Sequence, residues 1–194
     1  MNLISKKELF ERRDFYKEIM KDSIFIYPTD TIYGIGCNAL NGELVKELRT
    51  IKQSGSQPFS VIAPSKEWIL KNCIVDDKAK EWMDKLPGPL TLVLQMKNSS
   101  CIAKNVAPGL ETVGVRIPDH WISEIVADLG FPIITTSVNV SGEEFMTSID
   151  DLDQQIALLV DYIFYEGKID GKPSNIVHLE NGSAKIQERT GKNR

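Results

Sequence analysis

The chain has 194 residues, of which 42% are hydrophobic and 26% are charged, and its formal net charge is −4. This length is enough to bury a full core, and the acidic balance argues against a nucleic-acid-binding surface over the whole protein. No apolar run approaches the roughly 20 residues of a membrane span, and the charged N-terminal stretch lacks a signal-peptide core. We therefore expect one cytoplasmic domain over residues 1–194, with no membrane contact.

The first half of the chain alternates between predicted helices and strands. Ser5-Lys6-Lys7-Glu8 is a capping box that opens a helix to about Lys21. The elements expected next are a strand at 23–27, a helix at 43–52, a strand at 59–63 and helices from 66 and at 77–85.

The second half contains more strands. After the rigid break Pro87-Gly88-Pro89 we expect strands at 90–95 and 112–117, a helix capped by Asp119 that reaches Leu129, and a strand at 133–136. A helix at 149–160 and strands at 162–165, 175–179 and 184–188 complete the chain. This order predicts the α/β class, with a twisted, mixed, open sheet flanked by helices.

Two polar turns follow predicted strands. The first contains Thr29, Asp30 and Thr31 and ends in Gly34-Ile35-Gly36; the second is Thr135-Thr136-Ser137-Val138-Asn139-Val140-Ser141-Gly142. Open α/β sheets bind small ligands at strand ends, and hydroxyls with free backbone N–H groups there suit carboxylates and phosphates. Taken singly, either stretch is equally explained as an ordinary turn or helix cap.

Three cations stand at the ends of predicted elements: Lys52, Arg116 and Arg189. Together with the hydroxyl and amide groups of the polar turns they suggest an anion-binding ring. No Ser–His–Asp arrangement or phosphate loop is present, and Cys37, Cys73 and Cys101 lack metal-ligand spacing, so no protein-bound metal is predicted. From these residues alone we predict an anion or nucleotide site that works by positioning and charge neutralisation.

Several sequence blocks resemble the YrdC/TsaC family of L-threonylcarbamoyladenylate synthases, in the family's order and from about Ser23 to Arg189. The blocks are Pro28-Thr29-Asp30-Thr31-Ile32-Tyr33-Gly34, Lys52, Pro87-Gly88-Pro89-Leu90-Thr91, Val113-Gly114-Val115-Arg116, Ser137-Val138-Asn139-Val140-Ser141-Gly142 and Pro173-Ser174. The resemblance implies a twisted sheet around a concave basic cavity. It also implies an enzyme that condenses L-threonine, bicarbonate and ATP to threonylcarbamoyl-AMP and pyrophosphate, for the t6A modification of tRNA.

The resemblance also assigns residues. Catalytic roles fall to Lys52 and Arg116. The threonine subsite would be Thr31, Arg116, Thr135 and Ser174, and the nucleotide subsite would be Lys52, Thr112, Ser137, Asn139 and Arg189. Mg²⁺ would accompany ATP. Further partners implied are the proteins that transfer the product to tRNA, together with weak RNA binding.

One position departs from the family pattern of Lys-x-Arg. Here Lys52 is followed by Gln53 and Ser54, so a serine replaces the arginine. A charged hydrogen bond contributes on the order of 1.5–3 kcal/mol, and serine does not replace that charge. The sequence leaves open weakened ATP use, a rescuing cation such as Arg49, or a silent paralogue that binds nucleotide or RNA. We expect retained activity, in a short single-domain form of the family.

Two other functions compete. An RNA-binding module would explain a basic cavity, but the acidic balance and the lack of interleaved aromatic and basic residues weigh against it. A carbamoyl-adenylate role, as in the hydrogenase-maturation carbamoyltransferases, is less favoured because those proteins carry additional domains.

Overall fold

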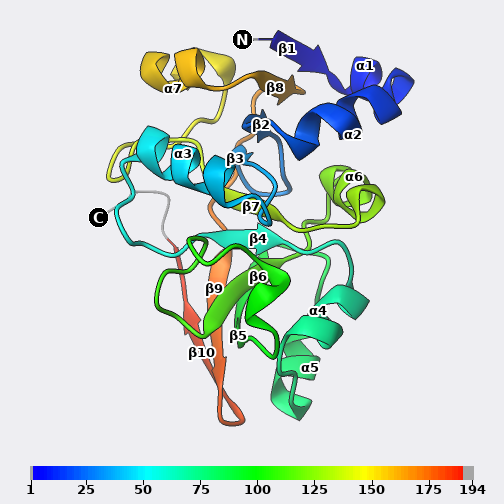
Figure 1. Ribbon diagram of the computed structural model, residues 1–194, viewed down its shortest axis with the longest axis vertical. Helices are drawn as coiled ribbons and strands as arrows, with labels where there is room; N and C mark the ends of the chain where they lie inside the picture. Colours follow the sequence, from blue (N-terminus) through cyan, green and yellow to red (C-terminus); the bar gives the residue numbers. More distant parts are fainter. Residues whose placement is uncertain (1, 190–194) are drawn as a thin grey trace.

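In the computed structural model, which describes residues 2–189, a single open sheet with helices on both sides runs the length of the molecule (Figure 1). Its strands, in spatial order, are β1 (Asn2–Ser5), β8 (Tyr162–Tyr165), β2 (Phe25–Tyr27), β3 (Gly34–Gly36), β7 (Ile133–Ser137), β4 (Ser60–Ile62), β6 (Thr112–Arg116), β5 (Leu90–Gln95), β9 (Asn175–Glu180) and β10 (Ser183–Gln187). The helices are α1 (Lys6–Glu11), α2 (Arg13–Lys21), α3 (Gly42–Lys52), α4 (Lys66–Asn72), α5 (Asp77–Met83), α6 (Ile122–Leu129) and α7 (Gln154–Leu159).

The sheet is mixed, as predicted. Strand β8 runs parallel to both β1 and β2, β4 runs parallel to β6, and β5 runs parallel to β9. The other neighbours are antiparallel, including β3 and β4 on either side of β7. Strand β7 is therefore central, and the second polar turn leaves from its end.

Both faces of the sheet are buried. The alternating side chains of β2 show this. Phe25 and Tyr27 of β2 belong to a core cluster with residues of α1, α2 and α6, whereas Ile26 belongs to a second cluster with residues of α3, α4 and α5. Successive side chains of a strand point to opposite faces. A strand that is apolar at every position therefore needs helices on both sides, and Figure 1 shows this arrangement.

Most predicted helices and strands are confirmed. Some of their ends differ from the prediction because contacts with residues distant in sequence decide them. Ser5 accepts a hydrogen bond from the Glu8 amide at 3.1 Å, as the capping box predicted, but the helix is interrupted at Arg12. The prediction that Asp119 caps the next helix was wrong: α6 begins at Ile122, and the Asp119 amide donates to Asp30 at 2.9 Å.

Three further elements differ from the prediction. Strands β1 and β3 were not predicted because each is short. Strand β1 pairs only with β8, which is distant in sequence, and β3 consists of Gly34-Ile35-Gly36, which lies between the neighbouring β2 and the distant β7. The predicted helix at 149–160 is divided into a 3₁₀ turn, Ile149–Asp151, and α7, which Asp153 caps separately.

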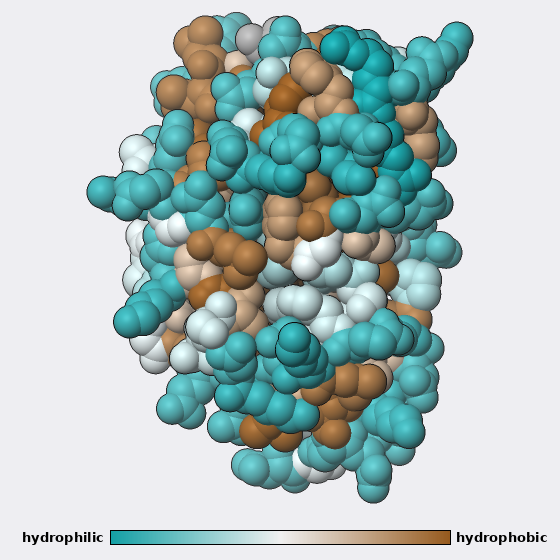
Figure 2. Space-filling model, turned by 45° about the vertical axis from the view of Figure 1, so that its right-hand side comes forward, coloured by the Kyte–Doolittle hydropathy of each residue, from teal (hydrophilic) through white to brown (hydrophobic). Residues whose placement is uncertain are grey.

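Among residues 2–189, no helix has the length and apolar character that crossing a membrane requires. Figure 2 shows one face on which hydrophilic side chains predominate and apolar ones are scattered among them.

Candidate active site

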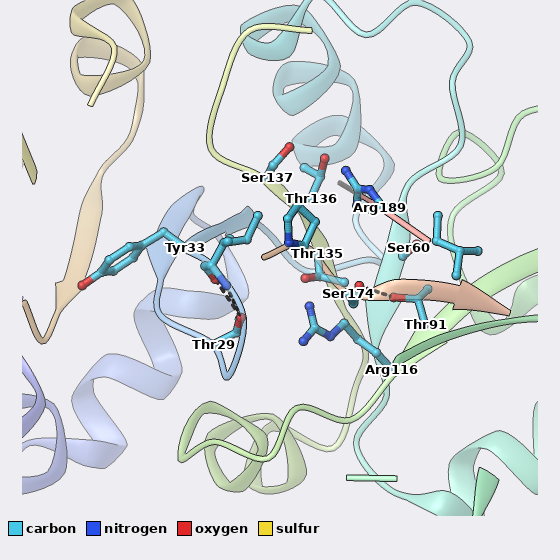
Figure 3. Close-up of a pocket in the computed structure, with 14 residues that line it drawn as sticks. Thr29, Tyr33, Ser60, Thr91, Arg116, Thr135, Thr136, Ser137, Ser174 and Arg189 are labelled. Atoms are coloured by element: carbon cyan, nitrogen blue, oxygen red, sulfur yellow. Dashed lines mark hydrogen bonds between the residues drawn. The ribbon is translucent and has the colours of Figure 1, made fainter. Parts of the chain in front are cut away.

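Two adjoining cavities lie where the ends of β4, β6 and β7 meet the polar turns. The larger has a volume of about 680 Å³ and is walled by the end of α3, the segment 54–60 and residues 135–142. The smaller is an inner recess under the β2–β3 turn, also lined by Thr91, Arg116 and Ser174 (Figure 3). Ser60, Thr135, Thr136, Ser137, Ile176 and Arg189 line both cavities, so the two form one site with two compartments.

Arg116 is the charged group of the inner recess. Its residue is 5% exposed, and its Nη2 atom donates to Asp30 Oδ1 at 2.5 Å and to Thr31 Oγ1 at 3.2 Å. The Nε atom is buried without a hydrogen-bond partner. Burial lowers the pKa of the guanidinium from its usual value, and the Asp30 carboxylate opposes that shift. A buried donor without a partner is costly, so an acceptor entering the recess would be stabilised here.

Hydroxyl groups fill the rest of the recess. Thr29 Oγ1 donates to the Ile32 carbonyl at 2.7 Å and lies 2.9 Å from Thr31 Oγ1. Across the recess, Thr91 Oγ1 and Ser174 Oγ lie 2.8 Å apart. These buried hydroxyls offer both donors and acceptors, so the recess suits a small polar anion.

Tight packing holds the β2–β3 turn in place. The Tyr33 ring points away from the recess (Figure 3), and its hydroxyl donates to the Gly167 carbonyl at 2.6 Å. Behind the turn lies Gly171, where a Cβ atom would come within 1.6 Å of the Thr31 carbonyl oxygen. Only glycine fits at that approach.

Lys52 lies in the wall of the larger cavity and is 3% exposed. Its Nζ atom donates to the Ser137 carbonyl, to the Asn139 carbonyl at 2.7 Å and to Asn139 Oδ1 at 3.3 Å. The Asn139 amide group in turn donates to the Glu143 carbonyl at 2.8 Å. Lys52 and Asn139 therefore hold the loop that follows β7 by hydrogen bonds, and the Lys52 ammonium group lies against the carbonyl groups of that loop.

The positive charge of Arg189 disfavours the charged forms of the two other predicted cations, Lys52 and Arg116. Burial, and to a smaller degree the charge of Arg189, lowers the pKa of Lys52 to about 7. Arg189 also opposes the charged form of Arg116, and its own pKa is lowered by burial. Bringing in an anion would relieve this mutual repulsion, so the site is suited to bind negative charge.

Arg49 holds the segment that follows α3. Its guanidinium donates to four backbone carbonyls, those of Asn105 at 2.7 Å, Gly55 at 2.8 Å, Gln57 at 2.9 Å and Val106 at 3.0 Å. It also stacks on the Phe59 ring, 4.4 Å from the centroid. Its Nη1 atom lies 3.5 Å from Ser54 Oγ as a donor, and Ser54 lines the larger cavity. Arg49 is thus engaged mainly with backbone carbonyls, although it reaches the serine that replaces the family arginine.

The predicted site residues are brought together with one exception. Thr31 reaches Arg116, and Thr135, Ser174, Lys52, Ser137, Asn139 and Arg189 line the two cavities. Thr112 is at the opposite end of β6 from Arg116, about 13 Å along the strand at 3.3 Å per residue, and lines a separate depression with Asp76 and Glu111. The structure therefore separates Thr112 from the other predicted nucleotide-subsite residues, which corrects that assignment. The matching block begins one residue later, at Val113, and did not indicate which end of the strand faces the cavity.

Sequence reasoning missed several residues that the structure places at the site. Thr29, Ser60, Thr91 and Thr136 line the cavities, and Asp30 pairs with Arg116. Thr29, Asp30 and Thr91 lie inside the quoted blocks, so proximity to the predicted residues was a usable signal. Ser60 offered none, since it is one polar residue at the start of an apolar strand.

No carboxylate lines either cavity, and residues 2–189 contain no group of histidine, cysteine and acidic side chains arranged to hold a metal ion. The oxygen atoms that could coordinate a metal ion in these cavities belong to hydroxyl, side-chain amide and backbone carbonyl groups. This donor set fits a magnesium ion that enters on the phosphates of a nucleotide, rather than one held by the protein alone.

The fold is an α/β domain with one open mixed sheet, and its site consists of a recess lined by hydroxyls and Arg116 beside a larger cavity lined by Lys52 and Arg189. The Sua5/YciO/YrdC family model, described as "Telomere recombination", matches residues 17–190, and the chain belongs to this family.

Named relatives agree with this membership. A Methanocaldococcus jannaschii protein, provisionally named threonylcarbamoyl-AMP synthase, is 39% identical over 170 residues, which cover 84% of this chain and 78% of the relative. The Bacillus subtilis threonylcarbamoyl-AMP synthase is 34% identical over 151 residues, or 74% of this chain but 43% of that enzyme. Sua5 of P. abyssi, solved in complex with L-threonine, superposes with a TM-score of 0.78 at 26% identity, covering 92% of this chain and 54% of Sua5.

Proposed function

We propose that this chain is a threonylcarbamoyl-AMP synthase, an enzyme that condenses L-threonine, bicarbonate and ATP to threonylcarbamoyl-AMP, pyrophosphate and water. The observation that carries the proposal is the buried Arg116, with a free Nε donor, at the base of a hydroxyl-lined recess that opens into a larger cationic cavity. The names of the relatives support the same reaction.

In this mechanism the inner recess holds threonine. The guanidinium of Arg116 pairs with the substrate carboxylate, and the hydroxyls of Thr31 and Ser174 offer further hydrogen bonds. The neutral amino group, held in place, attacks the carbon of bicarbonate; a C–N bond forms, a C–O bond breaks, and the lost oxygen leaves as water after taking up the amine proton, which gives a carbamate. Fixing these small reactants side by side lowers the entropic cost of the step.

ATP would occupy the larger cavity. A carbamate oxygen attacks the α-phosphorus, the bond to the β-phosphate oxygen breaks, and pyrophosphate leaves with the bonding electrons. Arg189 lies where it can pair with the phosphates, while Lys52 adds positive charge behind the loop after β7. The magnesium ion that accompanies ATP would neutralise further charge on the leaving pyrophosphate. Catalysis by positioning and charge explains why no acid–base pair lines the site.

We further propose that separate proteins consume the product by transferring it to tRNA for the t6A modification at position 37. Any direct contact of this chain with RNA would be weak, since the net charge is −4.

The test is pyrophosphate release by the purified protein with ATP and magnesium, adding threonine and bicarbonate separately and together. We expect release only when both are present, accompanied by a new adenylate on chromatography. Arg116→Gln serves as the matched inactive control. A folded wild-type protein that binds ATP or threonine in calorimetry but releases no pyrophosphate would contradict the proposal and favour a silent paralogue, for which Ser54 is the evidence.

A further inference from the structure

Among the described residues, Asp30 is the carboxylate that contacts Arg116. Asp30 Oδ1 accepts from Arg116 Nη2, and Asp30 Oδ2 accepts from the Asp119 amide at 2.9 Å. The side chains of Arg116 and Asp30 are 6% and 10% exposed, respectively. Asp30 therefore compensates a buried charge and fastens the β2–β3 turn to the segment after β6.

This contact occupies hydrogens that an incoming carboxylate would need. A guanidinium binds a carboxylate in a bidentate manner, through two parallel N–H groups. The edge between Nε and Nη1 is blocked by Cδ, so each available edge includes Nη2. Both Nη2 hydrogens are already donated, one to Asp30 and one to Thr31. A two-point grip on a substrate therefore requires one of these contacts to give way.

The two contacts are not equivalent. The Thr31 hydroxyl is neutral and can rotate to donate to the incoming carboxylate instead. Asp30 carries a negative charge that both holds Arg116 and repels a second carboxylate.

We propose that Asp30 is the internal counterion of Arg116, a positioning residue that holds the guanidinium in the ligand-free protein and limits the affinity of the recess for carboxylates. The inference rests on the proposed function, in that threonine is taken as the ligand. It explains how the Arg116 guanidinium is compensated in its buried position. Threonine binding then has to compete with Asp30.

The experiment compares Asp30→Asn with the wild type. Asparagine keeps the shape and can still accept from the Asp119 amide, but it removes the charge. Asp76→Asn is the charge-removal control, because Asp76 also accepts hydrogen bonds from backbone amides, those of Ala79 at 2.8 Å and Gly182 at 3.1 Å, but forms no ion pair among residues 2–189. Calorimetry measures the Kd of threonine and of 3-hydroxybutyrate, which retains the carboxylate and hydroxyl of threonine but lacks its amino group.

We expect Asp30→Asn to melt at a lower temperature without ligand and to bind both compounds roughly tenfold more tightly than the wild type, the value of one charge-assisted contact. Asp76→Asn should leave both Kd values unchanged. Equal or weaker binding of both compounds by Asp30→Asn would overturn the inference. Weaker binding of threonine alone would also overturn it, since Asp30 would then be holding the amino group.

A second comparison applies if Asp30→Asn does not fold. Removing both charges, in Asp30→Asn/Arg116→Gln, should give a protein at least as stable as Asp30→Asn, because breaking a buried pair is worse than replacing it. A double variant less stable than the single one would contradict the counterion role. If the wild type binds no threonine, the proposed substrate is wrong and the inference fails with it. Tight threonine binding without pyrophosphate release would instead overturn only the proposed reaction.

Discussion

Arg49 provides a quantitative test of how the wall of the larger cavity is held in place. Its guanidinium donates to four backbone carbonyls, two in the segment after α3 and two at Asn105 and Val106. In Arg49→Ala, water can reach the carbonyls of the exposed residues Gly55 and Gln57. The Val106 carbonyl keeps a hydrogen bond from the Phe59 amide at 2.9 Å, so the less exposed carbonyl that loses its donor is that of Asn105. A buried carbonyl left without a donor costs about 1–3 kcal/mol. The variant should therefore lose about 2 kcal/mol of unfolding free energy, roughly 4–8 °C of Tm for a chain of this length.

The loss of stability in Arg49→Ala should be accompanied by weaker use of ATP. Segment 53–58 carries Ser54 into the cavity wall, so its loosening should raise the KM for ATP and leave the KM for threonine unchanged. Thermal unfolding and pyrophosphate release measure the two effects on the same preparation. Arg49→Lys keeps the charge but loses the planar fork that reaches several carbonyls at once, so we expect it to be destabilised almost as much as Arg49→Ala.

The opposite pattern would refute this reasoning. If Arg49 instead supplied the charge missing at Ser54, Arg49→Ala would keep its Tm and lose ATP binding. Arg49→Lys would then retain much of the activity.

Three further predictions concern charge and space at the site. Ser54→Arg should restore a cation to the larger cavity and lower the KM for ATP by roughly tenfold; an unchanged or higher KM in steady-state kinetics would count against the cavity as the phosphate site. The folded-state pKa of Lys52, about 7, is below the ordinary 10.5. The unfolded chain therefore holds this proton to higher pH, so the Lys52 contribution to unfolding free energy should rise between about pH 7 and 10.5 by at most about 1.4 kcal/mol per pH unit. Denaturant titrations should show that rise in the wild type minus Lys52→Met difference, and parallel curves would refute it. Gly171→Ala should displace the Thr31 carbonyl and weaken threonine binding in calorimetry while ATP binding persists, because a Cβ there would lie 1.6 Å from that oxygen; unchanged threonine affinity would show that the turn can yield.

Most helices and strands, and the two polar turns, could be predicted from the sequence. These features depend on local chemistry: apolar runs with strand or helix period, capping side chains such as Ser5, and turn residues that cannot extend a strand. The mixed sheet followed from the order of the elements. The family blocks then selected residues that the structure gathers around two adjoining cavities.

The partners of those residues could not be predicted, because they depend on tertiary packing. Asp30 meets Arg116 across 86 positions of sequence, Lys52 meets Asn139 across 87, and Arg49 meets Asn105 across 56. A charged side chain has no fixed partner in sequence. Whether it is a ligand donor or a structural fastener depends on which carbonyls and carboxylates the packed sheet brings within hydrogen-bond distance. For this reason the sequence left a rescuing role for Arg49 open, and Thr112 was grouped with the site although it lies at the far end of its strand.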